Sequence, residues 1–272
     1  MWRKNIFFRS IPIFFIFAFS LLGTEARAYQ VSARSAIFSN STNGVRYYGK
    51  NVNTKVQPAS TTKVMTALLV LKRLPLDTVV TVSKNATSPQ PSKIYVKEGE
   101  SYRVRDLLYA LLLLSANDAA VVLAEAVSGS EENFVKEMNE YARRLGATHT
   151  RFVNTHGLPS KVKQYTTSYD MYLIFREALK QGFFREALQS KYKTISSTAG
   201  REIPLKNHNK ILFSEDWERK IYGKTGYTRA AQSCFVGYVL KGKSVCIIAV
   251  FGCSHRWKDI KHIVSKYGGI DL

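Results

Sequence analysis

The sequence has few cysteines and none of the spacings typical of metal or nucleotide sites. Three cysteines in 272 residues exclude a small scaffold held together by disulfides. The five histidines form no HExxH or comparable ligand pattern, so no metal and no other cofactor is expected. A phosphate-binding loop ending at Gly223-Lys224-Thr225 would need a glycine where Glu218 stands, and neither a dinucleotide fingerprint nor a GxSxG elbow is present.

Long apolar runs are also scarce, and the first of them predicts export. Arg3, Lys4 and Arg9 precede the apolar run Ile11–Leu22, which is too short to span a bilayer, and Ala26-Arg27-Ala28 follows. This order is typical of a signal peptide, so we expect residues 1–28 to be removed near Ala28. Residues 29–272 are then expected to form one soluble domain outside the cytoplasm, with neither a second C-terminal domain nor a membrane anchor.

Acidic residues are half as frequent as basic ones. The sequence contains 40 Lys and Arg against 20 Asp and Glu, a net charge of +20. Nucleic acid is the usual partner of so basic a chain. We expect none here, because the protein is predicted to be exported and has no block of five adjacent basic residues and no nucleic-acid motif. A basic surface would instead attract anionic material of the cell envelope, although most of these lysines are expected simply to be solvated.

The order of the predicted elements indicates an α+β fold. Two strands are expected within 29–57, around an Asn43-Gly44 turn. Helices are expected at 60–73, 104–114 and 119–127, after Ser130, after Thr167 and at 256–267. Strands are expected at 192–203, 220–228, 232–240 and 244–252. The N- and C-terminal strands should therefore form an antiparallel sheet packed against a mostly helical middle region. The three cysteines, Cys234, Cys246 and Cys253, are expected to be buried free thiols.

Ser60-Thr-Thr-Lys63 is the first candidate for chemistry. On a helix, residues i and i+3 share a face, so the Lys63 amine can reach the Ser60 hydroxyl and take its proton when neutral. Burial or a second cation nearby would favour the neutral amine. A lysine held in an internal salt bridge is the alternative. Two further SxxK matches, at Ser160 and Ser190, lie in hydrophilic surroundings and are interpreted as accidental.

Two more short motifs lie at positions in the predicted structure where they could form part of a site. Ser115-Ala-Asn117 interrupts the most apolar helical stretch, where polar side chains are either hydrogen-bonded in a core or exposed at a site. A simple turn between helices is the alternative. Lys224-Thr225-Gly226 falls on a predicted strand, where the glycine would let a ligand approach closely and the other two side chains would face an anion.

The trio Ser60-x-x-Lys63, Ser115-x-Asn117 and Lys224-Thr225-Gly226 resembles the signature of penicillin-binding proteins and serine β-lactamases. Four longer stretches resemble the low-molecular-mass penicillin-binding proteins that are D-alanyl-D-alanine carboxypeptidases: 58–66, 114–120, 154–159 and 223–228. The resemblance covers the chain from about Tyr29 to its end. It implies the β-lactamase-like transpeptidase fold, a periplasmic or extracellular location in a bacterium, and peptidoglycan stem peptides as substrates. Penicillins and other β-lactams are implied as inhibitors.

The resemblance also implies a role for each residue. Ser60 would attack the carbonyl of the penultimate D-alanine, with Lys63 as general base and Ser115 as proton relay to the leaving D-alanine. The substrate would be held by Asn117 at its amide and by Lys224 and Thr225 at its carboxylate. The N–H groups of Ser60 and of Tyr227, which follows Gly226, would form the oxyanion hole. Arg256 is the nearest candidate for a late arginine that binds the substrate carboxylate, and His156 is expected to be structural.

Other functions remain open at this stage. A DD-endopeptidase that cuts peptidoglycan crosslinks would break the same kind of bond. A β-lactamase shares the trio, but no ExxLN-type deacylation motif lies between Ser115 and Lys224. A non-catalytic protein that only docks on peptidoglycan would not need a nucleophile, its base and a second serine together.

Overall fold

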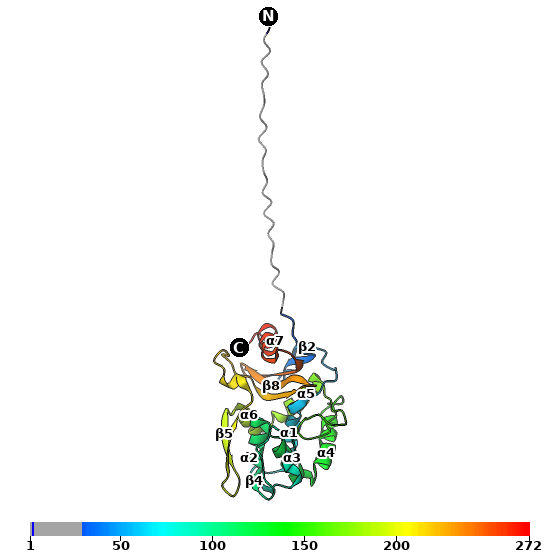
Figure 1. Ribbon diagram of the computed structural model, residues 1–272. Coiled ribbons are helices and arrows are strands. Elements are labelled where there is room, and N and C mark those ends of the chain that lie inside the picture. The colour runs from blue at the N-terminus through cyan, green and yellow to red at the C-terminus, as the bar shows by residue number, and fades with distance from the viewer. Residues whose placement is uncertain (1, 3–28) are drawn as a thin grey trace. The chain divides into compact units, whose positions relative to one another are not determined.

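A five-stranded antiparallel sheet forms the frame of the fold (Figure 1). The computed structural model describes residue 2 and residues 29–272, so the predicted signal-peptide cleavage lies outside the described residues. The strand order is β2-β1-β9-β8-β7, and every neighbouring pair is antiparallel. The strands are β1 (Ser35–Asn40), β2 (Arg46–Lys50), β7 (Tyr222–Thr228), β8 (Gln232–Lys241) and β9 (Ser244–Cys253). The first two strands and the last three thus meet in one sheet, as predicted.

The central strands are buried on both faces, which explains their unbroken apolar sequence. Residues 246–251 of β9 and 234–239 of β8 are all buried. Helix α5 (Ser168–Ala178) packs on one face of the sheet and helix α7 (Arg256–Gly268) on the other (Figure 1). At the end of α7, Gly268 lies against the ring of Phe38, so close that a Cβ at this position would be 2.6 Å from the ring.

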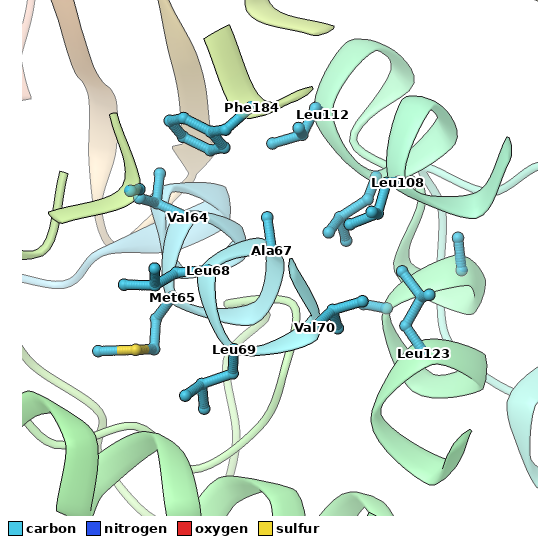
Figure 2. Packing of buried hydrophobic residues seen from close by; sticks show 14 of the residues in the cluster. Val64, Met65, Ala67, Leu68, Leu69, Val70, Leu108, Leu112, Leu123 and Phe184 are labelled. Atoms are coloured by element: carbon cyan, nitrogen blue, oxygen red, sulfur yellow. The ribbon is translucent and has the colours of Figure 1, made fainter. Parts of the chain in front are cut away.

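The middle of the chain forms the helical part. Its helices are α1 (Lys63–Arg73), α2 (Val104–Tyr109), α3 (Asn117–Ser128), α4 (Glu131–Arg144) and α6 (Gly182–Gln189). Helix α1 is buried along most of its length and packs against α5 and α3. Figure 2 shows its apolar side chains facing Leu108 of α2, Leu123 of α3 and Phe184 of α6. Small paired strands complete this part: β3 (Val79–Thr81) with β4 (Ser101–Arg103), and β5 (Tyr192–Ser196) with β6 (Glu202–Lys206). The α+β prediction is confirmed.

Three predicted elements differ in detail from the structure. The strand expected at 192–203 is a hairpin, β5 and β6, because the chain turns at Gly200, whose φ is +86°. The helix expected from Ser60 begins as the 3₁₀ turn η1 (Ala59–Thr62) and becomes α-helical only at Lys63. The helix expected over 104–114 is α-helical to Tyr109 and continues as the π-helical segment η3 (Ala110–Leu114).

The three cysteines are buried and free, as predicted. Strands β8 and β9 pair without a break from Lys241–Ser244 to Phe235–Val250, and a bulge follows between Ser233 and Phe235, where Cys234 lies. The outer edge of the sheet at β7 contacts η1. The fold therefore brings the segment that contains Ser60 beside the strand that contains Lys224.

Candidate active site

Ser60 lies on a tight turn with an unusual backbone. Its neighbour Ala59 has a φ of +46°, a conformation that costs a non-glycine residue free energy and that clusters at functional sites. The Thr61 N–H and hydroxyl both donate to the Pro58 carbonyl, at 3.2 and 2.7 Å, and hold the turn closed. The Ser60 side chain is only partly buried and lines a pocket of about 350 Å³.

Gly157 supports this turn from behind. A Cβ at Gly157 would be 1.8 Å from the Ala59 carbonyl oxygen, and the φ of Gly157 is +89°, so only glycine fits. The Gly157 N–H donates to the Asn154 side chain at 2.7 Å, and the Thr66 hydroxyl of α1 donates to the Thr155 carbonyl at 2.6 Å. The loop 154–158 thus fixes the turn that presents Ser60.

Lys63 is fully buried beneath Ser60. Its Nζ lies 3.2 Å from the Ser60 hydroxyl, 2.6 Å from Oδ1 of Asn117 and 2.7 Å from the carbonyl oxygen of His156. Burial lowers the pKa of Lys63 well below its usual value, and the nearby Lys224 cation lowers it further. A neutral amine has two N–H groups, which the Asn117 and His156 oxygens can accept, and its lone pair is then free to face the Ser60 hydroxyl.

Ser115 lies where the π-helical segment ends. Its φ of 65° is left-handed, and this turn separates η3 from α3. π-Helical turns are rare and often accompany functional sites. The Ser115 hydroxyl is buried and has no hydrogen-bond partner in the described structure, although the residue lines the same pocket as Ser60. An unpaired buried hydroxyl costs stability, which is consistent with a group kept for a reactant.

Asn117 and Asp118 begin α3, and their hydrogen bonds link the site to the loop that precedes β4. The Asn117 side chain accepts from Lys63 and donates to the Gln90 carbonyl at 2.6 Å, and the Asn117 N–H donates to the Ser92 carbonyl. The Asp118 carboxylate accepts the N–H groups of residues 94 and 96. Asn117 therefore lies beneath the pocket, where it orients Lys63 and the loop around Ser92.

The edge strand β7 forms the opposite wall. Thr225, Gly226 and Tyr227 line the pocket, whereas the Lys224 side chain is buried and donates to the Thr225 carbonyl at 3.1 Å. Burial, with a contribution from the Arg256 cation, lowers the pKa of Lys224 to about 7. A Cβ at Gly226 would be 3.1 Å from the Ser60 backbone nitrogen, so glycine permits the close approach of the two segments.

Arg256, at the start of α7, lines the same pocket. Its guanidinium donates to the carbonyl oxygens of Gly226 and Cys234 at 3.1 and 2.9 Å and lies 4.5 Å from the Trp257 ring centroid. Its Nε is buried and has no hydrogen-bond partner among the residues that the structure describes. Arg256, the arginine that the family resemblance implied as a ligand of the substrate carboxylate, therefore lies beside β7.

The structure brings the sequence-predicted residues together and adds two that the sequence did not indicate. Ser92 and His208 line the pocket with Ser60 and Ser115. Neither lies in a motif with its own chemical signature, so no sequence pattern could have singled them out. Burial and the cations of Lys224 and Lys63 lower the pKa of His208 to about 4, so its ring is neutral at neutral pH.

His156 is also neutral, because burial and the Lys63 cation lower its pKa to about 3. Its Nδ1 accepts the Leu158 N–H at 3.2 Å, within the loop that supports Ser60. Among the described residues, no group of three or more His, Cys, Asp or Glu side chains could hold a metal ion. No helix in the described part of the chain is long and apolar enough to cross a membrane.

Comparison with known proteins points to one family. Residues 23–255 match the family model described as D-alanyl-D-alanine carboxypeptidase. The chain is 34% identical to D-alanyl-D-alanine carboxypeptidase DacF of Bacillus subtilis over 82% of its length, and 33% identical to DacC of Escherichia coli over 88%. A relative named D-alanyl-D-alanine endopeptidase, from Pseudomonas aeruginosa, is 30% identical over 76% of the chain. The matches span 58% of DacF, 61% of DacC and 67% of the endopeptidase.

Solved structures give the same result for the fold. The Streptomyces K15 DD-transpeptidase superposes with a TM-score of 0.81 at 28% identity, covering 89% of this chain and 99% of that one. A D-alanyl-D-alanine carboxypeptidase from Mycobacterium tuberculosis superposes with a TM-score of 0.81 at 31% identity, covering 90% of this chain and 94% of that one. The expected transpeptidase fold is confirmed.

Proposed function

The chain belongs to the D-alanyl-D-alanine carboxypeptidase family, and from this premise we propose that it is a serine DD-carboxypeptidase. It removes the terminal D-alanine from peptidoglycan stem peptides through an acyl-enzyme on Ser60, and penicillins acylate the same hydroxyl. The observation that carries the proposal is the position of Lys63. Its buried amine has a lowered pKa, two oxygen acceptors for its N–H groups, and Ser60 Oγ at 3.2 Å.

Acylation begins when the neutral Lys63 amine takes the proton of the Ser60 hydroxyl as the oxygen attacks the carbonyl of the penultimate D-alanine. The oxyanion is stabilised by the N–H groups of Ser60 and Tyr227, on the two segments that Gly226 allows to approach. Donors of this kind typically lower a barrier by about 3–4 kcal/mol each. Lys224 and Thr225 bind the terminal carboxylate, and Arg256 adds positive charge at the same end of the pocket.

The C–N bond then breaks, and the leaving amine takes a proton through the Ser115 hydroxyl, whose proton is replaced from the charged amine of Lys63. The unpartnered state of Ser115 leaves it free for this transfer. Water attacks the ester in the second half of the reaction, with the neutral Lys63 again accepting a proton. Asn117 keeps Lys63 in place through both halves, and it is also proposed to hold the amide of the substrate.

We further propose that the protein acts outside the bacterial cytoplasm after removal of residues 1–28. Its substrate is found there, and the N-terminal sequence has the charged, apolar and small-residue order of a signal peptide. N-terminal sequencing of the protein secreted by an expressing bacterium tests this directly. A mature chain beginning at Tyr29 is the expected result, and retention of Met1 would contradict it.

Release of free D-alanine tests the proposed activity. The purified protein is incubated with a pentapeptide that ends in D-alanyl-D-alanine, and with a penicillin as a separate substrate. We expect D-alanine release that is absent in Ser60→Ala, and a slowly hydrolysed penicillin adduct. Rapid penicillin turnover without D-alanine release would instead indicate a β-lactamase. Peptide binding with no release and no adduct would indicate a protein that only docks on peptidoglycan.

A further inference from the structure

Two hollows outside the catalytic pocket are lined by basic side chains, and Tyr165 lines both of them. In the first hollow, of about 340 Å³, the basic residues are Arg34, Lys55 and Lys163. In the second, of about 470 Å³, they are Lys136, Arg143 and Arg151. Neither hollow shares a lining residue with the catalytic pocket. These six side chains and Tyr165 are called the Tyr165 surface below.

Backbone pairing brings the Tyr165 surface together from separate segments. Arg151 and Tyr165 exchange two N–H to carbonyl hydrogen bonds, of 2.8 and 3.0 Å, and Val56 and Thr166 form a second antiparallel pair. Residues directly opposite each other in such a pair have neighbouring side chains on the same face, so Arg151 lies beside Tyr165. The Lys55 amine lies 4.3 Å from the Tyr165 ring centroid. One cation from each hollow is therefore next to this ring.

Most of the positive charge on this surface is not neutralised. Among the described residues, no carboxylate lines the first hollow, and the one that lines the second, Glu140, lies 3.6 Å from Arg144 on its own helix. Five exposed cations have no salt bridge in the described part of the chain: Arg34, Lys55, Arg143, Arg151 and Lys163. Concave surfaces lined by charge of one sign attract the opposite charge, so the fitting ligand is anionic.

Gln164 gives a second indication of a ligand, one that does not depend on charge. Its side chain lines the first hollow and is only 6% exposed. The amide nitrogen donates to the Leu158 carbonyl at 2.7 Å, whereas the buried Oε1 has no hydrogen-bond partner among the described residues. A buried acceptor without a donor costs stability. A ligand with a hydroxyl group would supply that donor.

The composition of the Tyr165 surface favours a polymer over a membrane. None of the exposed large apolar side chains of the described chain lines either hollow, so none is available there to enter a bilayer. Cations that line hollows instead fit separate anionic groups. Two such hollows around one aromatic ring fit a chain along which anionic groups repeat.

We propose that the Tyr165 surface binds a linear polymer of polyol or sugar units, with phosphodiester or carboxylate groups repeated along the chain and free hydroxyls between them. The cations bind the anionic groups, and Gln164 accepts a hydrogen bond from a hydroxyl. This site is separate from the catalytic pocket, so the polymer and a substrate peptide can be bound together. Binding would hold the enzyme wherever such a polymer is present.

Titration with defined polymers tests the proposal. The purified protein is titrated at about 0.1 M salt with 1,3-linked poly(glycerol phosphate), with polygalacturonate and with neutral dextran. We expect binding to at least one anionic polymer, the tighter of which identifies the anionic group, and none to dextran. The quadruple variant Lys55→Gln, Arg143→Gln, Arg151→Gln, Lys163→Gln should bind the tighter polymer about tenfold or more weakly, because four exposed ion pairs are lost.

A control variant separates this site from net charge. Lys84→Gln, Lys97→Gln, Lys243→Gln, Lys266→Gln removes the same charge from exposed positions that line neither hollow, and it should weaken polymer binding less than about threefold. Vesicles of anionic phospholipid respond to net charge, so the two quadruple variants should lose vesicle binding equally. Equal loss of polymer binding in both variants would overturn the proposal. So would binding to neither anionic polymer, or a loss of vesicle binding confined to the first variant.

Gln164→Met tests the hydroxyl contact, since it removes the acceptor and no charge. Affinity for the tighter polymer relative to inorganic polyphosphate, which has no hydroxyls between its phosphates, should fall about threefold or more. An unchanged ratio would overturn the assignment of a hydroxylated polymer.

Hydrolysis of a short pentapeptide is measured alongside polymer binding. The wild type and both quadruple variants should release D-alanine at the same rate, because none of the substituted side chains lines the catalytic pocket. Absence of hydrolysis in all three would refute the proposed function and leave the binding result intact. Hydrolysis without selective polymer binding would refute only the polymer site.

Discussion

At the scale of single residues, the site depends on where two lysines are buried. Lys63 and Lys224 are almost inaccessible to solvent, and burial lowers the pKa of each amine. The sequence indicated Lys63 because it follows Ser60 by three residues at the start of an apolar helix. It could not indicate that Asn117 and the His156 carbonyl share the same amine, since these contacts join segments 54 and 93 residues away.

The Ser115→Ala variant is predicted to lose activity without losing stability. Ser115→Ala removes a buried hydroxyl that has no hydrogen-bond partner in the described part of the chain, so we expect a melting temperature that is unchanged or higher than that of the wild type. The leaving amine loses its proton relay, so kcat should fall by about 10²–10⁴. Calorimetry and peptide hydrolysis on the same preparation measure both quantities. A destabilised variant with normal kcat would contradict the role given to Ser115.

The pH dependence of kcat/KM follows from the two buried amines. Lys63 acts when neutral, so activity rises with pH through its lowered pKa. Lys224 binds the carboxylate when charged, so activity declines as pH rises through its pKa of about 7. We expect a bell-shaped profile for a carboxylate substrate measured between about pH 5 and about pH 9. The alkaline limb of kcat should lie at higher pH, because a bound carboxylate stabilises the charged Lys224. A flat profile would refute this assignment.

At the scale of elements, the site lies where regular structure stops. Ser60 is on the 3₁₀ turn η1 before α1, and Ser115 is a left-handed residue after the π-helical η3. The mainly apolar runs 60–73 and 104–114 predicted both helical stretches. It could not predict their irregular ends, because the positive φ values of Ala59 and Ser115 are imposed by tertiary contacts and not by local propensity.

Gly157 tests whether the support of η1 matters for catalysis. Gly157→Ala would place a Cβ 1.8 Å from the Ala59 carbonyl oxygen, so the turn that presents Ser60 must move. Gly129→Ala is the matched control, since Gly129 also has a positive φ but a Cβ there would meet no atom within 4 Å. Both variants should lose about 1 kcal/mol or more of stability from backbone strain.

Only the Gly157→Ala variant is expected to lose acylation as well. Its rate of reaction with penicillin should fall at least about tenfold, whereas Gly129→Ala should react at the wild-type rate. Equal acylation rates in the two variants would show that the loop 154–158 does not position Ser60.

At the scale of the whole molecule, the sequence predicted the architecture but not all of its details. The α+β architecture could be predicted because the terminal strands and the helical middle differ clearly in their apolar patterns. The hairpin of β5 and β6 could not be separated from one long strand, since its turn is short and its strands are mostly exposed. The presence of Ser92 and His208 in the catalytic pocket was beyond sequence reasoning, because the pocket is lined by residues that lie far apart in the sequence.

The net charge, +20 for the full sequence and +17 for residues 29–272, predicts attraction to anionic envelope surfaces. Binding of the purified protein to isolated bacterial cell walls should weaken strongly as salt rises from about 0.05 M to about 0.5 M, because screening shortens the reach of surface charges. Vesicles of neutral and of anionic phospholipid provide the matched comparison. Binding that does not change with salt, or that is equal for both vesicles, would show that charge does not localise the protein.

The central claim is that Ser60 is a nucleophile activated by Lys63, and a labelled penicillin tests it most directly. The protein is incubated with the label, digested, and the modified peptide is located by mass spectrometry. We predict one adduct, on the Ser60 hydroxyl, absent in Ser60→Ala and formed at least about 100-fold more slowly in Lys63→Met. An adduct on any other residue, or one that persists in Ser60→Ala, would contradict the account.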